Sequence, residues 1–167
     1  MDPLSAAVFA KIDEQIERTG HLLAFVARTD WAPPIAGAWT CGALLGHLLD
    51  CMAGVCAVLY AARPEPLAHF PDMQKLPVNF ACGAEEAGRR MAAYRASIAE
   101  GFAALRDSDL GRRLPTVFVA DGEPVLTLLL GNLEHLVNHK HQLFMYLKLA
   151  GAEVGTRDLY QFRDQQG

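Results

Sequence analysis

The chain has 167 residues, of which 51% are apolar, and a net charge of −4 at neutral pH. This length fits a single domain over residues 1–167 that buries its own hydrophobic core. The negative charge, without a broad basic patch, argues against nucleic acid and anionic membranes as partners. Ala and Leu are heavily used and β-branched residues are sparse, which favours helices over sheets.

The cysteines and the first residues bear on where the protein works. Four cysteines occur without CxxC spacing, at Cys41, Cys51, Cys56 and Cys82. This usage indicates reduced, buried thiols in a cytosolic protein more than a disulfide or thiolate site. The first residues show no positively charged segment followed by an apolar run, so we expect no export signal and a cytoplasmic location.

The first predicted helix covers about residues 3–28, with Asp2 as capping residue and Pro3 in its first turn. Its apolar residues recur at steps of three and four, at Leu4, Val8, Ile12, Ile16, Leu23 and Val26. Two prolines after residue 32 end the pattern. His21 falls near the charged side of this helix, so we expect it at the surface.

Thr40 is placed to cap a second helix that runs to about residue 62 and is apolar nearly all round. Its length would suffice to span a membrane. His47 and Asp50 lie in its middle, however, and glycines and alanines dilute its hydrophobicity. We therefore expect the central helix of a bundle or part of a dimer face.

Residues 63–82 contain four prolines and form a long irregular connection. A helix over residues 40–62 is about 34 Å long, whereas some twenty extended residues reach over roughly 60 Å. The chain can therefore return along the bundle and begin the third helix parallel to the second. Connections of this length also tend to line binding sites.

The third predicted helix covers about residues 84–106, with an inner stripe of Met91, Tyr94, Ile98, Phe102 and Leu105. A short extended piece is predicted at 116–119 and a tight turn at Asp121-Gly122. The fourth helix begins at Pro124 and ends at Gly151.

Two histidines in the fourth helix, His135 and His139, are four residues apart and leave the same helical face. Two imidazoles at this spacing can bind one metal ion, and catalytic sites often use three protein ligands and leave one position open. His47, in the second helix, is the natural candidate for the third ligand.

The histidine pair alone is a weak motif. With six histidines in the chain, such a pair arises by chance in roughly one sequence in five. The alternative interpretation is that His135 and His139 are half-buried bundle residues satisfied by carbonyls or water. Against it, a bundle core would have to desolvate three imidazoles, a cost that metal coordination removes.

Two stretches resemble the signatures of the DinB-like (YfiT-like) four-helix-bundle metalloproteins. Trp39-Thr40 is followed by His47 and then Leu48-Leu49-Asp50; about ninety residues later comes the stretch from His135 through His139 and Gln142 to Tyr146-Leu147-Lys148-Leu149-Ala150-Gly151. The resemblance spans nearly the whole chain. It implies an all-α four-helix bundle of up-down-down-up topology, with the long crossover between helices two and three.

The same resemblance implies His47, His135 and His139 as the metal ligands. Family members are often dimers, and those of known activity include metal-dependent transferases and isomerases that use low-molecular-weight thiols. Where family members usually have Arg-Gly after the second helix-four histidine, this chain has Lys140-His141. His141 projects away from the ligand stripe, so we expect a surface or dimer-contact role for it.

The leading hypothesis is a metal-dependent enzyme, either a thiol-dependent transferase or a hydrolase, acting on a small molecule. The divalent ion is expected to be zinc or nickel, with manganese and iron as further options. Asp50 is the candidate for a carboxylate that supports a metal ligand or accepts a proton, or else a capping or solvated residue. Asn138, Gln142 and Tyr146 are candidates for substrate binding, although packing is the commoner role of such residues.

A second hypothesis is a non-catalytic bundle that binds a small molecule or a partner. Its histidines would hold a structural metal or none. A zinc site closed by a fourth protein ligand would favour this hypothesis. Cys51, one helical turn after His47, is a lesser candidate to approach the metal, and burial is its expected role.

Overall fold

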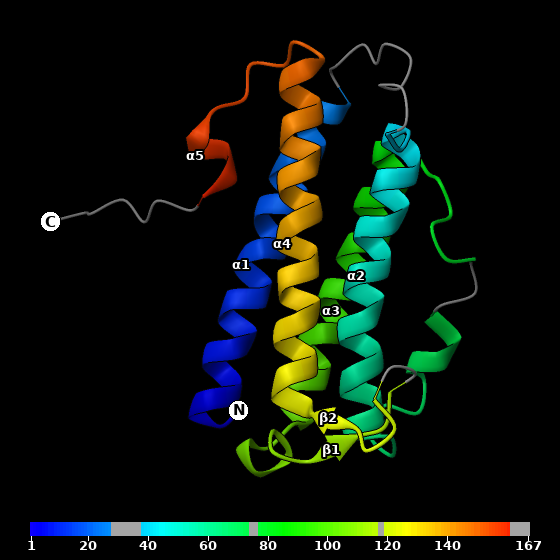
Figure 1. The fold of residues 1–167 in the computed structure, drawn as a ribbon, viewed down its shortest axis with the longest axis vertical. Helices are drawn as coiled ribbons and strands as arrows, with labels where there is room; N and C mark the ends of the chain where they lie inside the picture. The colour runs from blue at the N-terminus through cyan, green and yellow to red at the C-terminus, as the bar shows by residue number, and fades with distance from the viewer. Residues whose placement is uncertain (28–37, 74–76, 117–118, 161–167) are drawn as a thin grey trace, which may run out of the picture.

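The structure, a computed structural model, describes residues 1–27, 38–73, 77–116 and 119–160. Four long helices make up most of it: α1 (Pro3–Val26), α2 (Cys41–Ala62), α3 (Ala84–Ala104) and α4 (Val125–Leu149) (Figure 1). The short elements are η1 (Phe70–Met73), η2 (Asp107–Asp109), β1 (Arg113–Leu114), β2 (Glu123–Pro124) and α5 (Thr156–Leu159). The predicted all-α four-helix bundle is confirmed.

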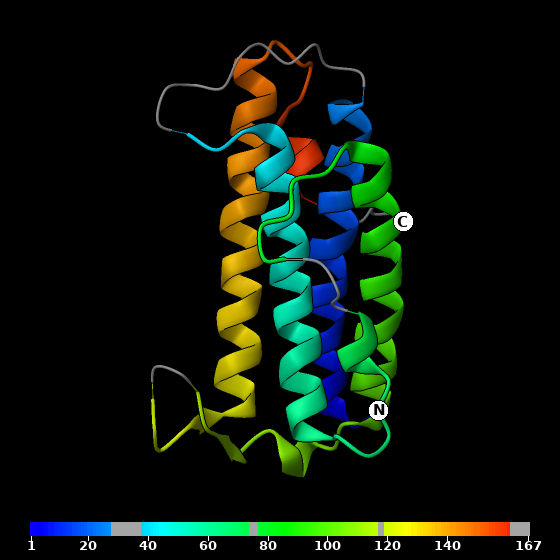
Figure 2. The same ribbon diagram turned by 90° about the vertical axis from the view of Figure 1, so that its right-hand side faces the viewer.

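The two middle helices run in the same direction, while α1 and α4 run in the other (Figure 1). The described parts of the connection, residues 63–73 and 77–83, lie along α2 before α3 begins (Figure 2). The backbone amide of Cys82 donates to the carbonyl of Gly42 at 3.2 Å, which places the start of α3 beside the start of α2. The up-down-down-up order and the long crossover are therefore as predicted.

Helix α2 is the central helix of the bundle because it packs against α3 on one side and α4 on the other, with η1 over part of its length. This position explains its largely apolar sequence. Eleven of its apolar side chains are buried: Leu44, Leu45, Leu48, Leu49, Cys51, Met52, Ala53, Val55, Cys56, Leu59 and Ala62. By length and composition alone α2 could cross a membrane, but most of it is buried inside the bundle.

Two of the predicted helix ends are present as expected. The Thr40 hydroxyl accepts a hydrogen bond from the Ala43 amide at 3.1 Å, so it caps α2. Gly151 follows α4 with a φ of 81°, a left-handed conformation that glycine adopts without steric cost.

The predicted start of α1 is confirmed, with Asp2 before the helix and Pro3 in its first turn, but the Asp2 side chain does not cap the helix. Asp2 occupies the N-cap position, but its side chain makes no capping hydrogen bond. Its carboxylate instead accepts from the Asp107 amide at 3.0 Å. The Asp107 carboxylate caps α1 from outside the helix, accepting from the Ser5 hydroxyl at 2.7 Å and the Ser5 amide at 2.8 Å. These bonds from Ser5 lower the pKa of Asp107.

The connection between α3 and α4 is a small antiparallel hairpin in which Arg113 lies opposite Pro124. Gly122 takes a φ of 75° in its turn, as the Asp121-Gly122 pair predicts. The extended piece was predicted at 116–119, but the paired strand lies earlier, at Arg113–Leu114; residues 117 and 118 lie outside the described part. The Arg113 guanidinium donates to the Asp121 carbonyl at 3.1 Å and thereby closes the turn.

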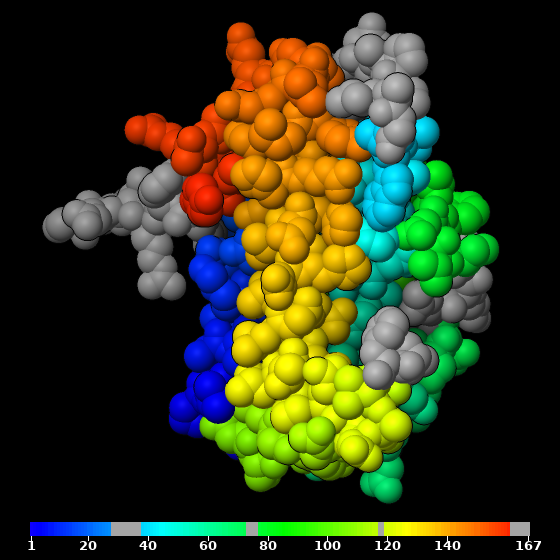
Figure 3. All heavy atoms as spheres, in the orientation of Figure 1, coloured from blue at the N-terminus to red at the C-terminus, as the bar shows by residue number. Residues whose placement is uncertain are grey.

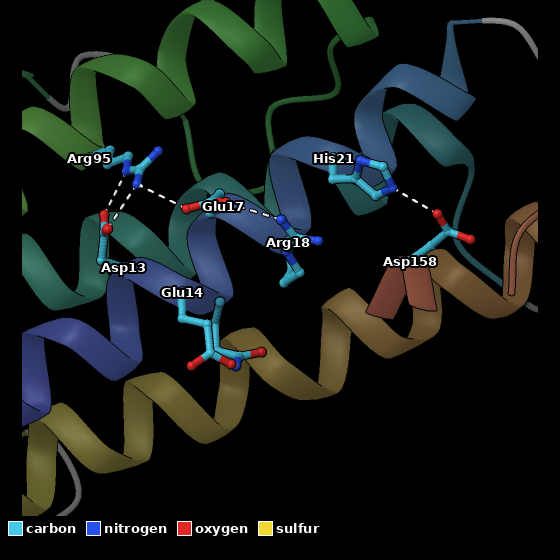
Figure 4. A network of polar contacts seen from close by, with 8 residues as sticks. Asp13, Glu14, Glu17, Arg18, His21, Arg95 and Asp158 are labelled. Atoms are coloured by element: carbon cyan, nitrogen blue, oxygen red, sulfur yellow. Dashed lines mark hydrogen bonds and ion pairs between the residues drawn. The ribbon is translucent and has the colours of Figure 1, made fainter. Parts of the chain in front are cut away.

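Surface ion pairs join α1 to its neighbours (Figure 4). Arg95 on α3 donates to both carboxylate oxygens of Asp13, at 2.5 and 2.8 Å. His21 is exposed, as expected, and its Nε2 lies 2.7 Å from Asp158 of α5. These contacts join α3 to the middle of α1 and α5 to its C-terminal part.

Candidate metal centre

Three histidines that are far apart in the sequence meet between α2 and α4. One nitrogen atom from each of His47, His135 and His139 lies within 4.8 Å of the other two. The Nε2 atoms of His47 and His135 are 2.9 Å apart. The ring of His139 lies 4.3 Å from that of His47 and 4.8 Å from that of His135, measured between centroids. The structure thus brings all three predicted metal ligands to one point.

Hydrogen bonds to amide oxygens orient two of the rings. The Nδ1 atom of His47 lies 2.6 Å from the side-chain oxygen of Asn79, and Nδ1 of His139 lies 2.9 Å from that of Gln142. An amide oxygen only accepts, so these contacts favour the tautomer of each ring with the proton on Nδ1. In that tautomer Nε2 presents a lone pair, which is the form in which imidazole binds a metal.

Trp39 forms an aromatic wall beside the histidines. Its ring stacks on His139 at 5.5 Å with an angle of 8° between the planes. It also meets His47 edge-on at 4.5 Å. Trp39 is itself 39% exposed, and so is one of the large apolar side chains that solvent reaches. One side of the centre is thus covered, while the exposed ring of His135 leaves another side open.

Two of the three imidazoles, His135 and His139, have lowered pKa values. Burial is the main cause that lowers the pKa of His135, and the neighbouring His139 and His47 add to it. Burial also lowers the pKa of His139, although its hydrogen bond with Gln142 acts in the opposite direction. Protonation of His135 and His139 is also disfavoured by the nearby rings, because a second positive charge would repel the first.

The donor set fits a divalent transition metal. Neutral imidazoles suit zinc, nickel and iron, and three of them match a site that keeps a position for a further ligand. Within the part of the chain that the structure describes, no Cys, Asp or Glu joins the three histidines. This arrangement agrees with the open site of the first hypothesis more than with a closed structural site.

Asp50 does not point at the histidines as a free carboxylate. It accepts a hydrogen bond from the backbone amide of Asn79 at 2.5 Å. Gln142 uses both ends of its amide, because its nitrogen donates to the Tyr146 hydroxyl at 3.4 Å. Asn138 is exposed on α4. A catalytic role for Asp50 and substrate binding by the other three remain predictions.

The remaining histidines and cysteines lie elsewhere. His141 is exposed on α4, and His69 pairs with Glu100 at 3.2 Å on the surface. Cys51 is 2% exposed, and burial raises the pKa of its thiol to about 12. Cys56 is likewise buried, with a pKa raised by burial to about 12. The expectation of reduced, buried thiols holds for these two and for Cys82, whereas the free thiol of Cys41 is only half-buried.

Sequence reasoning missed Asn79 and Gly46, and it noted Trp39 only as part of a motif. Asn79 lies in the crossover, which was expected to line a site only because of its length. Gly46 precedes His47, and a Cβ there would overlap the carbonyl oxygen of Phe80. No local pattern reveals either residue, because both act through contacts between α2 and a segment some thirty residues later.

Comparisons with known proteins agree with this architecture. The DinB superfamily model matches residues 11–143. A crystal structure of the DinB-like protein YjoA from Bacillus subtilis superposes with a TM-score of 0.68 at 16% identity, covering 94% of this chain and 99% of that one. No curated protein matches the sequence. On the strength of the family match over most of its length, the chain belongs to the DinB superfamily.

Proposed function

We propose that the protein is a cytoplasmic metal-dependent enzyme whose three histidines hold one divalent ion, and that it acts as a thiol-dependent transferase or a hydrolase on a small molecule. The observation that carries this proposal is the convergence of three imidazole nitrogens within 4.8 Å, without a fourth ligand among the described residues. Zinc or nickel is the proposed ion, with manganese or iron as alternatives.

When bound, such an ion would supply Lewis-acid activation of a water molecule or a thiol near neutral pH. His47 and His139 would hold it through the Nε2 atoms that their hydrogen bonds to Asn79 and Gln142 leave bare. Trp39 would exclude water from one side of the centre and offer a flat apolar surface to the substrate.

The cysteines of the protein support an external thiol as the nucleophile in a transferase. Burial raises the pKa of Cys41 to about 11 and that of Cys51 to about 12. Thiols with such values stay protonated at neutral pH and are poor nucleophiles. Thiol chemistry at this centre would therefore use a low-molecular-weight thiol that enters from solution.

The experiment is a turnover screen on zinc- and nickel-loaded protein purified without a tag. It measures conjugation of small thiols to electrophiles and hydrolysis of simple esters. We expect an activity that His139→Ala abolishes and His141→Ala retains, since His141 lies on the same helix but is exposed away from the centre. An activity equal in both variants would not arise at the three histidines and would contradict the proposal.

The second candidate is a non-catalytic bundle with the same histidines. It is favoured by the two ring nitrogens of His47 and His135 that lie 2.9 Å apart, because a hydrogen bond between two neutral imidazoles accounts for that contact without a metal. Stable folding without metal, together with no turnover across the screen, would support this candidate.

We also propose that the protein forms a homodimer through α4. The outer side of this helix, which runs along the face in Figure 3, carries three exposed large apolar side chains, Leu130, Met145 and Leu149. Equilibrium sedimentation is the measurement. We expect a two-chain mass that Met145→Glu reduces to one chain, whereas a one-chain mass for the unmodified protein would contradict the dimer.

A further inference from the structure

We infer that Asn79 of the crossover is a positioning residue of the metal centre, which fixes the proton of His47 on Nδ1, and that Asp50 and Gly46 hold Asn79 in place. The inference rests on the proposed metal-binding function for its purpose, although the geometry stands without it. The crossover between α2 and α3 would then be part of the centre and not only a connection.

Neutral His47 has two tautomers, which differ in the ring nitrogen that carries the proton. With the proton on Nδ1, the Nε2 lone pair faces His135 and His139; with the proton on Nε2, an N–H group would occupy the same space and block a ligand bond. The side-chain oxygen of Asn79 lies 2.6 Å from Nδ1 and accepts its proton in a hydrogen bond. Asn79 therefore favours the metal-binding tautomer before any metal arrives.

The backbone of Asn79 adopts a conformation that few residues with a side chain adopt. Its φ is 59°, in the left-handed region, which asparagine adopts more readily than most residues with a side chain. Its backbone amide donates to Asp50 at 2.5 Å. Asp50 lies three residues after His47 on α2, so one turn of helix holds both ends of Asn79: the ring of His47 contacts its side chain and Asp50 contacts its backbone.

The crossover approaches α2 closely at Gly46. A Cβ on Gly46 would overlap the carbonyl oxygen of Phe80, which belongs to the residue after Asn79. Any larger side chain would push this backbone away from the helix. Gly46 thus allows the close contact that lets the short side chain of Asn79 reach His47.

A comparison with His139 shows why this arrangement matters. The acceptor for His139 is Gln142, three residues later on the same helix. Their hydrogen bond can therefore form as soon as α4 folds. The acceptor for His47 comes from 32 residues away and depends on the tertiary position of the crossover. The orientation of the first ligand is therefore coupled to a segment outside the helices, and Asp50 acts through Asn79.

The test uses metal-free protein and two variants. Asn79→Gly removes the amide but accepts a positive φ, and Asn79→Asp keeps an acceptor oxygen at the same place. The ¹⁵N chemical shifts of the His47 ring report its tautomer, and calorimetric titration with zinc reports affinity. A melting curve of each variant separates a local change from general unfolding.

We expect the Nδ1–H tautomer in the unmodified protein and in Asn79→Asp. In Asn79→Gly we expect a mixture of tautomers and zinc affinity weakened about 10- to 100-fold, as when such hydrogen-bond partners of metal ligands are lost. An Nε2–H tautomer in the unmodified protein would overturn the inference, as would an Asn79→Gly variant with unchanged tautomer and affinity. Failure of the unmodified protein to bind zinc would count against the proposed function, whereas the tautomer is read without metal.

Discussion

The Nε2 atoms of His47 and His135 lie 2.9 Å apart although 88 residues separate them in the chain. Helix α2 and helix α4 pack along each other, and the contact between these two histidines lies between them. Two imidazole nitrogens at this distance can form a hydrogen bond when one of them carries a proton, or can bind one metal ion when neither does. The predictions for this site depend on this contact between His47 and His135.

The metal-free protein should lose stability as pH falls. Burial and neighbouring histidines lower the pKa of His135 and of His139 in the folded state. In the unfolded chain a histidine has a pKa of about 6.5, so below that pH the unfolded chain binds more protons than the folded one. The stability that the two neutral histidines contribute is therefore complete above about pH 6.5 and is lost as the pH falls through their lower pKa values in the folded state. Urea unfolding at pH 7.5 and 5.5 should show the loss.

The matched variants for this experiment lie on the same helix. Replacing the two rings whose pKa is lowered, in His135→Gln/His139→Gln, should make the stability depend less on pH between these values. His141→Gln should leave the pH dependence as it is, because that ring is exposed away from the cluster. If the stability of the double variant depends on pH as strongly as that of the unmodified protein, the loss of stability arises from other groups.

Gly46→Ala should weaken metal binding more than it weakens the fold. The added methyl would overlap the Phe80 carbonyl, so the crossover must shift and carry Asn79 away from His47. Gly88→Ala is the control, since a Cβ there meets no atom within 4 Å. Zinc titration should give a weaker affinity for Gly46→Ala and an unchanged one for Gly88→Ala. Equal zinc affinities of the two variants would show that the crossover can shift without weakening metal binding.

How much of this site the sequence predicts depends on whether its contacts are local. The ligands on α4 follow from helical spacing, and the inner stripe of α3 follows from the same period, as buried Tyr94 and Ile98 show. The capping of α1 by Asp107 and the contact of Asn79 with His47 join segments far apart in the sequence. Such pairs leave no periodic pattern, so only the fold reveals them.

Gly101→Ala should destabilise the bundle, whereas Gly88→Ala on the same helix should stabilise it. A Cβ on Gly101 would lie 2.7 Å from Cδ1 and 3.0 Å from Cβ of Leu59, which is fully buried in α2. Overpacking of this kind costs about 1–3 kcal/mol and exceeds the gain of up to about 1 kcal/mol from the better helix former. Denaturant unfolding measures both; a more stable Gly101→Ala would mean that α2 and α3 separate easily.

Lys140 should hold the C-terminal segment against the bundle. It is 3% exposed, and its ammonium donates to the side-chain oxygen of Gln15 at 2.7 Å and to the Leu159 carbonyl at 3.0 Å. Lys140→Met keeps the apolar stem but leaves both acceptors without this donor, at a cost of about 1–3 kcal/mol. Limited proteolysis should then cut near α5 sooner.

The control for this prediction is Lys148→Met. Lys148 is exposed on α4, with its ammonium 5.2 Å from the centre of the Phe144 ring. Its replacement should change stability by less than about 0.5 kcal/mol, as is usual at the surface. If proteolysis near α5 proceeds equally fast in both variants, the contacts of Lys140 do not secure the segment.

X-ray absorption at the zinc edge, on zinc-loaded protein purified without a tag and dialysed, tests the metal centre most directly. We predict one zinc ion per chain with three imidazole nitrogens at about 2.0–2.1 Å, and loss of the ion in His47→Ala. A protein that retains no zinc, or whose zinc has no imidazole neighbours, would contradict the account.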